Sequence, residues 1–256
     1  MRAMMREGAR LIGIGGTADA IKALPAMGWQ AVGTATMFEL PLAGDALRAG
    51  LRDRVKVSLP GEGLMLSAFA SAWFRPRRRR YAGGLALPSA TIGDEVAALY
   101  EGDTGYDVVQ RADPAFIRWG ASYPGNGAYT AWHFLVQNRV RGWGLTRAYE
   151  TEAGREAAIV DIFAPNADVD LYAWMVSEMS SALVSVRPRI IRARASCPLL
   201  QAALRANRFR AGASVPIFTS PKDLSSAARI HITLHHTDGP FRPYPAAGAA
   251  TGFLVS

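Results

Sequence analysis

The sequence predicts an α+β fold, in which a mixed, mostly antiparallel sheet is flanked by helices. Two observations predict this class. A strand–helix–strand pattern near the N-terminus returns about 180 residues further along the chain. Three strand-like segments lie between the two patterns, separated by the short breaks that are typical of hairpin-connected antiparallel strands.

The first strand–helix–strand unit begins with the short apolar segment Leu11–Ile14, which has the composition of a buried strand. Thr17 is a favourable N-cap for the helix that follows, and Gly28 is a favourable end for it. We expect Pro25 to disturb the last helical turn, because proline lacks the N–H that the turn needs. A second strand is expected from Trp29 to Leu40.

The second unit repeats this order with a strand at Ile190–Ala195, a helix, and a strand at Ala211–Thr219. Pro198 suits the first helical turn, where its missing N–H costs nothing. An aromatic residue follows each helix, Trp29 in one unit and Phe209 in the other. The shared order predicts a duplication. Six identities occur at the common offset: Ala23/Ala203, Leu24/Leu204, Ala26/Ala206, Ala31/Ala211, Phe38/Phe218 and Pro41/Pro221.

The remaining elements are predicted from periodicity, caps and turn residues. In chain order, we expect a strand or loop at Arg52–Ser58, a helix at Leu64–Phe74, a linker at Arg75–Ser89, a helix at Ile92–Tyr100, a helix that opens at Asp113 and ends at Tyr123–Gly127, strands at Tyr129–Gln137, Gly142–Tyr149 and Ala157–Phe163, a helix at Asp168–Leu183, and a last strand at Ala228–Leu234.

The composition is that of an ordinary globular protein, since half of the 256 residues are hydrophobic and 20% are charged. The single cysteine, Cys197, excludes an intrachain disulfide framework and favours a reducing compartment. No apolar stretch of about 18 residues and no signal-peptide pattern is present. We therefore expect a cytoplasmic protein that does not interact with a membrane.

Arginine dominates the net charge of +8, because only Lys22, Lys56 and Lys222 of the 29 basic residues are lysines. The one cluster is Arg75–Arg80. This run could contact the phosphates of a nucleic acid or nucleotide cofactor, or it could be a solvated linker. Without interleaved aromatic residues or a nucleic-acid motif, nucleic acid is not the expected partner.

Two segments resemble strands of the GNAT (N-acetyltransferase-like) superfamily. Val140–Arg147 resembles the family's third strand, and Ala158–Pro165 resembles its splayed fourth strand. The resemblance implies a GNAT-like domain at residues 91–256, preceded by a linker with a helix at 46–90. Residues 1–45 would be the closing strand–helix–strand unit of an incomplete first copy, whose front is lost or remodelled. The implied activity is acyl-CoA-dependent N-acyl transfer to a small amine or amino-sugar, by a monomer or a homo-oligomer.

The resemblance also implies the cofactor-binding residues. The freed backbone of Ile162, Phe163 and Ala164, together with Asn166, would receive acetyl-CoA or another acyl-CoA. The family's Arg/Gln-x-x-Gly-x-Gly/Ala loop holds pyrophosphate at a helix N-terminus. Residues 164–170 contain no glycine here, and their two carboxylates would repel phosphate. Either the phosphates bind elsewhere, for example near the 75–80 arginines, or coenzyme A is not the donor.

For the chemistry, Asp161 is the best-placed carboxylate to take a proton from the amine. The alternative is a polar residue on the open face of a strand. The tyrosine that acts as proton donor in the family is not found, because Asn207 and Phe209 stand in that region. Tyr172 is a poor substitute, since it belongs to the preceding helix.

Cysteine and histidine residues suggest two further sites. Cys197 at a helix start could be an activated thiolate, or a small buried capping residue. The group His231, His235, His236 and Asp238 contains ligand types that bind zinc, but a terminal strand entering a polar turn explains it equally well, so no metal is predicted. Two other functions remain open: a catalytically inactive GNAT-like binding module, and a transferase that uses aminoacyl-tRNA.

Overall fold

A computed structural model describes residues 11–43, 78–90, 92–109, 111–122, 127–220 and 229–236. Several predictions lie outside these residues: the elements expected at 52–58 and 64–74, the helix end at 123–126, the arginines at 75 and 77, and Asp238.

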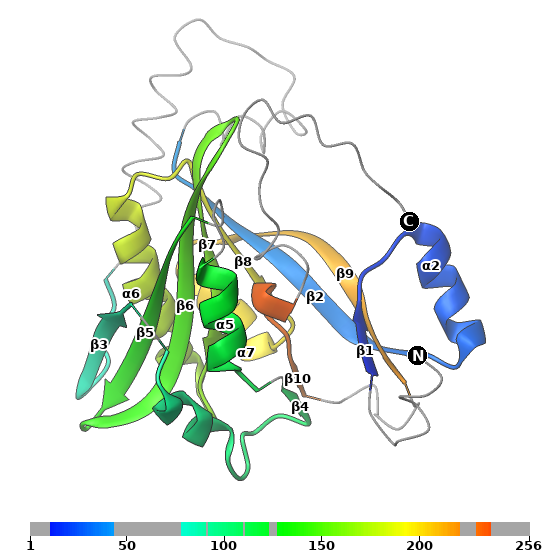
Figure 1. Cartoon of the computed structure of the whole chain (residues 1–256), viewed down its shortest axis with the longest axis horizontal. Coiled ribbons are helices and arrows are strands. Elements are labelled where there is room, and N and C mark those ends of the chain that lie inside the picture. The colour runs from blue at the N-terminus through cyan, green and yellow to red at the C-terminus, as the bar shows by residue number, and fades with distance from the viewer. Residues whose placement is uncertain are drawn as a thin grey trace, which may run out of the picture.

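The main feature is an eight-stranded sheet in the order β1-β9-β2-β8-β7-β6-β5-β3 (Figure 1). The pair β7–β8 is parallel, and the other neighbouring pairs are antiparallel. This confirms the predicted mostly antiparallel α+β sheet. The strands are β1 (Leu11–Ile14), β2 (Gln30–Pro41), β3 (Gly84–Ser89), β5 (Ala128–Val136), β6 (Arg139–Thr151), β7 (Gly154–Phe163), β8 (Ile190–Ala195) and β9 (Arg210–Ser220); β4 (Val108–Val109) and β10 (Ile230–His231) form a separate parallel pair.

Helices lie on both faces of the sheet. The helices α6 (Val169–Ser185) and α7 (Pro198–Ala206) cover one face and share a core with it. The other face packs against the 3₁₀ helix η2 (Asp94–Tyr100) and the helix α5 (Pro114–Ser122). The remaining helical segments are α2 (Ala18–Ala23), η1 (Leu24–Met27) and η3 (Leu234–His236).

Two glycines on β6 let α6 approach the sheet closely. A Cβ at Gly142 would lie 2.8 Å from the Cε atom of Met175, and one at Gly144 would lie 2.6 Å from the Sδ atom of Met179. Side chains at these positions would displace the ends of these methionines, because protein interiors are close-packed. The start of α6 is thereby held at the end of β7, where the candidate site lies.

The two strand–helix–strand units interlock. The second strand of each unit, β2 or β9, lies between the two strands of the other unit. The registers agree at an offset of 180 residues: the pair Ala31–Phe218 corresponds to Ala211–Phe38, and Gly13–Phe218 corresponds to Ala193–Phe38. The four strands β1-β9-β2-β8 are therefore arranged with an approximate twofold symmetry that relates one unit to the other.

The helix N-caps predicted at Thr17 and Asp168 are confirmed. The side chain of Thr17 accepts a hydrogen bond from the Ala20 N–H, and that of Asp168 accepts one from Leu171. The α-helical part of the first unit ends at Ala23, and a 3₁₀ turn containing Pro25 follows it.

Three predictions need correction. Residues 84–89 of the expected linker form β3, an edge strand that tolerates Pro88 because its outer side needs no N–H donor. The helix expected from Ile92 is a 3₁₀ helix that begins at Asp94. The last strand is shorter than predicted, since β10 covers only Ile230–His231 and leads into η3. Each error concerns a segment whose conformation depends on what it packs against.

The interlocked position of β2 predicts a large effect of truncating Phe38, whose side chain is fully buried. We expect Phe38→Ala to lower the free energy of unfolding by about 3–5 kcal/mol, measured by urea denaturation. Ile12→Ala on the edge strand β1, where Ile12 is 39% exposed, is the control and should cost about 1 kcal/mol or less. Equal losses in the two variants would contradict the central place of β2.

Candidate functional site

The site begins where β7 and β8 separate. Their parallel pairing is limited to Ala157–Ile191 and Ala158–Arg192. Beyond these pairs β7 continues to Phe163 with a bulge at Val160, where its register against β6 shifts. A bulge re-aims side chains and bends the strand away from its neighbour. The splayed strand expected at 158–165 is therefore confirmed.

A short segment from the C-terminal part of the chain, Arg229–His236, fills the gap between the separated strands; we call it the strap. On the β8 side, Thr233 forms an antiparallel bridge with Ala195, and the Ile232 N–H donates to the Ser196 hydroxyl at 2.8 Å. On the β7 side, His231 Nε2 donates to the carbonyl oxygen of Ile162 at 2.8 Å. The strap thus occupies hydrogen-bonding groups of both strands.

The strap is part of the folded core. Its apolar side chains Ile230, Ile232 and Leu234 are buried in clusters with the sheet. Burying three such side chains contributes about 5–9 kcal/mol as an upper estimate. A micromolar ligand gains about 8 kcal/mol on binding. Displacing the strap would therefore use a large part of the binding free energy of such a ligand, and we describe the strap as a fixed part of the site.

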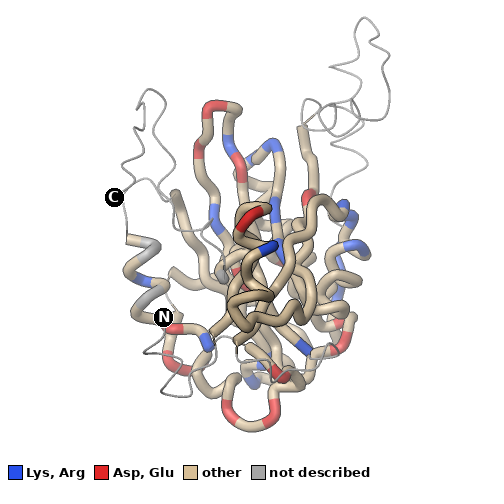
Figure 2. Tube along the Cα trace, turned by 90° about the vertical axis from the view of Figure 1, so that its right-hand side faces the viewer, with Lys and Arg blue, Asp and Glu red and all other residues tan. Residues whose placement is uncertain are grey.

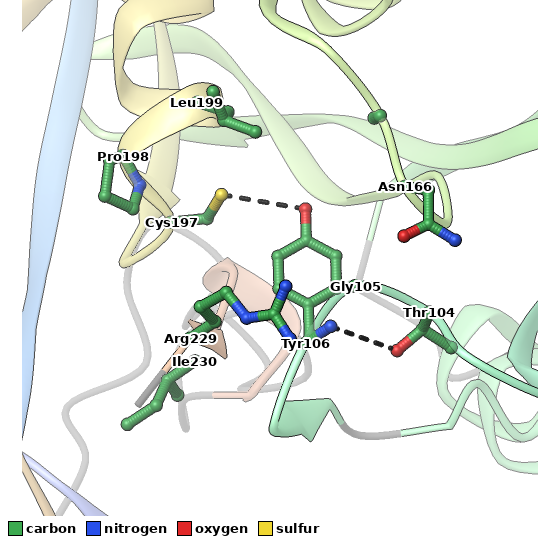
Figure 3. A pocket seen from close by; sticks show the side chains of 10 residues that line it. Thr104, Gly105, Tyr106, Asn166, Cys197, Pro198, Leu199, Arg229 and Ile230 are labelled. Atoms are coloured by element: carbon green, nitrogen blue, oxygen red, sulfur yellow. Dashed lines mark hydrogen bonds between the residues drawn. The ribbon is translucent and has the colours of Figure 1, made fainter. Parts of the chain in front are cut away.

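A pocket of about 400 Å³ opens beside the strap, at the N-terminal ends of α6 and α7 (Figure 3). A cavity of this size is suitable for a small molecule. Its lining combines the loop before β4, the start of both helices and the first residues of the strap: Thr104, Gly105, Tyr106, Asn166, Ala167, Cys197, Pro198, Leu199, Arg229 and Ile230. The predicted cofactor residue Asn166 lies here.

Three polar side chains form a hydrogen-bonded chain at this pocket. The hydroxyl of Tyr106 lies 2.8 Å from the hydroxyl of Tyr172 and 3.6 Å from the Sγ atom of Cys197, which faces it in Figure 3. Burial raises the pKa of Tyr106, and the neighbouring Cys197 raises it further. Burial likewise raises the pKa of Tyr172 well above its ordinary value. Both phenols therefore keep their protons at neutral pH.

The loop before α6 is held by a close approach of two backbones. The side-chain amide of Asn166 donates a hydrogen bond to the Asp103 carbonyl oxygen at 2.7 Å. The backbone N–H of Asn166 donates one to the Thr104 carbonyl oxygen at 2.9 Å. Gly105 has a φ of +79°, and a Cβ there would lie 2.6 Å from Asn166 Oδ1. Glycine is needed at this position for both reasons.

The charges around the pocket are mixed. Arg229, one of its lining residues, forms an ion pair of 3.7 Å with Asp107, and both side chains are well exposed. Asp168 uses its carboxylate as the N-cap of α6, and Asp170 lies in the first turn. In Figure 2, basic and acidic residues are interspersed along the described part of the chain. Phosphate binding at this helix start would depend on Arg229 and on backbone N–H groups.

Asp161, on β7, contacts the strap at Thr233. Its side chain is 2% exposed, so the expected alternative of a residue on an open strand face is wrong. Its Oδ1 atom accepts hydrogen bonds from the Ile162 N–H and from the Thr233 hydroxyl, both at 2.8 Å. Tyr100 is close to it: burial raises the pKa of Tyr100, and the negative charge of Asp161 raises it further.

The predicted cofactor residues have different surroundings. The backbone N–H of Ile162 donates a hydrogen bond to the Asp161 carboxylate, and its carbonyl oxygen accepts one from His231. Phe163 stacks on Tyr100 at 4.3 Å between ring centroids, and Ala164 is fully buried. Sequence reasoning missed Tyr106, Arg229 and Thr233, since none of them belongs to a recognisable motif. It also underrated Tyr172, whose hydroxyl reaches the Ala164 backbone from within α6.

Cys197 and His231 are both buried. Cys197 is buried at the N-cap of α7 and makes no capping hydrogen bond through its side chain. Burial lowers the pKa of His231, which favours its neutral form. Within the described ranges, no three His, Cys, Asp or Glu side chains are grouped to hold a metal ion. Among the helices of those ranges, none is long and apolar enough to cross a membrane.

The sheet with one parallel pair, the bulge on its longer strand and the helix starting beside it together define the GNAT fold. A solved GCN5-related N-acetyltransferase from Anabaena variabilis has a similar structure, with a TM-score of 0.54 at 8% sequence identity. That similarity covers 85% of this chain and 47% of the other, so the chain spans about half the length of that protein.

A second similar structure is the N-myristoyltransferase of Saccharomyces cerevisiae with bound myristoyl-CoA. Its TM-score is 0.48 at 11% identity, over 74% of this chain and 50% of that chain. The sequence matches no protein-family model and no curated protein. The similarity to known proteins therefore lies in the fold.

The close contact at Gly105 predicts a difference between two glycine substitutions. Gly102 and Gly105 have φ values of +76° and +79°, but a Cβ at Gly102 would meet no atom within 4 Å. We expect both alanine variants to lose about 1 kcal/mol from the left-handed backbone. Gly105→Ala should lose at least about 1 kcal/mol more, because it also displaces Asn166. Thermal unfolding measures the difference, and equal melting temperatures would contradict the contact.

Proposed function

We propose that this protein is an acyl-CoA-dependent N-acyltransferase. The observation that carries the proposal is the pocket at the starts of α6 and α7, which lies beside the separated strand β7 and contains the Tyr106 hydroxyl. The GNAT fold supports the same assignment, because it places a helix N-terminus and an irregular strand next to each other.

The pocket fits the thioester end of an acyl-CoA better than its phosphates. Apolar Ala167, Pro198 and Leu199 line it together with the Tyr106 hydroxyl. The first turn of α6 presents Asp168 and Asp170 in place of glycines. We propose that Arg229 contacts the pyrophosphate and that this contact is weak, because Arg229 is exposed and already paired with Asp107.

In the proposed reaction, the amine nitrogen bonds to the thioester carbonyl carbon, the carbon–sulfur bond breaks, the amine gives up a proton and the thiolate takes one. Tyr106 donates the proton to the sulfur, because its protonated hydroxyl lies at the pocket. Tyr172, 2.8 Å away, orients the Tyr106 hydroxyl. Asp161 accepts the proton of the amine.

The acceptor in this proposal is a small amine or amino-sugar that approaches from the face of η2, past Tyr100. The burial of Asp161 supports a small acceptor. A cytoplasmic location is part of the proposal and agrees with the single, unpaired Cys197.

We also infer that the two interlocked units arose by duplication. The agreement of their strand registers at the same offset as the six sequence identities supports this origin. Two unrelated units would have no reason to share a register.

A second candidate function is a non-catalytic module that binds an acyl-CoA in the same pocket. The strap favours it, since it occupies hydrogen-bonding groups of both separated strands. Thiol release from acetyl-CoA with a panel of small amines distinguishes the two functions. Turnover supports the transferase; binding by calorimetry without turnover supports the module; absence of both contradicts both.

The role of Tyr106 predicts a specific loss of rate. We expect Tyr106→Phe to lower kcat by about 100-fold or more, because a general acid contributes a factor of that order, with little change in KM for acetyl-CoA. Tyr81→Phe is the matched control, since Tyr81 stacks on Trp174 away from the pocket. The same kcat in Tyr106→Phe and in the unaltered protein would exclude this proton donor.

Because the proposed contact of Arg229 with the pyrophosphate is weak, the protein should bind acetyl-CoA only slightly more tightly than a thioester without the phosphates. We expect acetyl-CoA to bind at most about tenfold more tightly than S-acetyl-pantetheine, because an exposed ion pair contributes about 1 kcal/mol or less. Arg229→Ala should remove this preference and leave the binding of S-acetyl-pantetheine unchanged. Calorimetry measures both affinities, and weaker binding of S-acetyl-pantetheine to the variant would show that Arg229 does not act on the phosphates.

A further inference from the structure

The strap reaches Asp161 with one polar side chain, Thr233. The two residues are 72 positions apart in the sequence, and their contact is a 2.8 Å hydrogen bond from the Thr233 hydroxyl to Asp161 Oδ1. Both side chains are buried, at 1% and 2% exposure. A hydrogen bond to a buried carboxylate is stronger than one in water, and its loss leaves the carboxylate short of a donor.

The two hydrogen bonds of Asp161 determine the direction of its carboxylate. The Ile162 N–H donates to Oδ1 from the neighbouring position on the same strand, and Thr233 donates to the same atom from the strap. Two donors on one oxygen restrict rotation of the group about its terminal bond. In the proposed reaction, the other oxygen, Oδ2, accepts the proton of the amine.

The backbone of Thr233 is itself held in place. It forms an antiparallel bridge with Ala195 at the end of β8, and its neighbours Ile232 and Leu234 are buried in two different core clusters. The hydroxyl is therefore delivered by a rigid segment, which is the condition for positioning a catalytic group accurately.

We propose that Thr233 is a positioning residue that orients Asp161 to take the proton of the acceptor amine. This inference rests on the proposed function and on the role of Asp161 in it. Thr233 does not contact the reacting atoms in this proposal and acts through the carboxylate alone. In this proposal the strap contributes a side chain to the active site, in addition to the residues of β7, α6 and α7.

The test uses two substitutions that separate the hydroxyl from the shape of the side chain. Thr233→Val keeps the shape and removes the donor, and Thr233→Ser keeps the donor. We expect Thr233→Val to lower kcat about tenfold or more with KM for acetyl-CoA changed less than about threefold, because misplacement of a catalytic group acts on the transition state. Thr233→Ser should stay within about threefold of the unaltered protein.

A double-variant cycle shows whether Thr233 acts through Asp161. In an Asp161→Asn background, Thr233→Val should cause no further loss of kcat, because residues that act as one unit are not additive. Equal losses in the valine and serine variants, or fully additive losses in the double variant, would overturn the proposal. Circular dichroism and melting temperature verify that each variant is folded.

A measurement without turnover keeps this proposal separate from the proposed function. The ¹³C carboxyl resonance of Asp161, assigned by its loss in Asp161→Asn, should shift in Thr233→Val and stay nearly unchanged in Thr233→Ser. An unaltered protein that turns over no acyl-CoA would contradict the proposed function. An Asp161 resonance that is the same in Thr233→Val would contradict the positioning contact, whether or not the protein is active.

Discussion

The separation of β7 from β8 after two parallel pairs is the constraint on which the rest of the structure depends. Two strands that part leave backbone N–H and C=O groups without partners, and burying such groups costs free energy. The strap satisfies part of this need through His231, Ile232 and Thr233. The same separation lets the helix starts of α6 and α7 meet beside the gap, which forms the pocket.

The polar groups at the pocket and in the gap are held by hydrogen bonds. Tyr106 and Tyr172 share a short hydrogen bond, and burial keeps both protonated. Asp161 is the buried acid in the gap, and Thr233 and its own strand supply its donors. A buried acid of this kind is stable when its hydrogen bonds are made, because the low dielectric strengthens them.

The interlocking of the two strand–helix–strand units explains why the N-terminal segment is essential to the sheet. β2 pairs with both β8 and β9, so β9 joins the rest of the sheet only through the first unit. The buried side chain of Phe38 packs against the same core as α6 and α7. The site therefore depends on residues that are far from it in the sequence and make no contact with a substrate.

Much of the fold was determined by the sequence alone. The caps Thr17 and Asp168, the short breaks between β5, β6 and β7, and the repeated unit are local signals, and local signals need no knowledge of the partner segments. The splayed strand was found through resemblance to a family, and the role of Asp161 in that resemblance stays a prediction. The 3₁₀ form of η2 and the edge strand β3 could not be predicted, because packing decided them.

Only the tertiary structure decided which side chains meet at the site. Tyr106 and Cys197 are 91 positions apart, and Asp161 and Thr233 are 72 apart. Tyr106 belongs to no predicted element, and the strand predicted at Ala228–Leu234 does not by itself show what Arg229 and Thr233 contact. Their positions follow from the separation of two strands and from the segment that fills it. This is a property of the packed sheet, which a single sequence does not display.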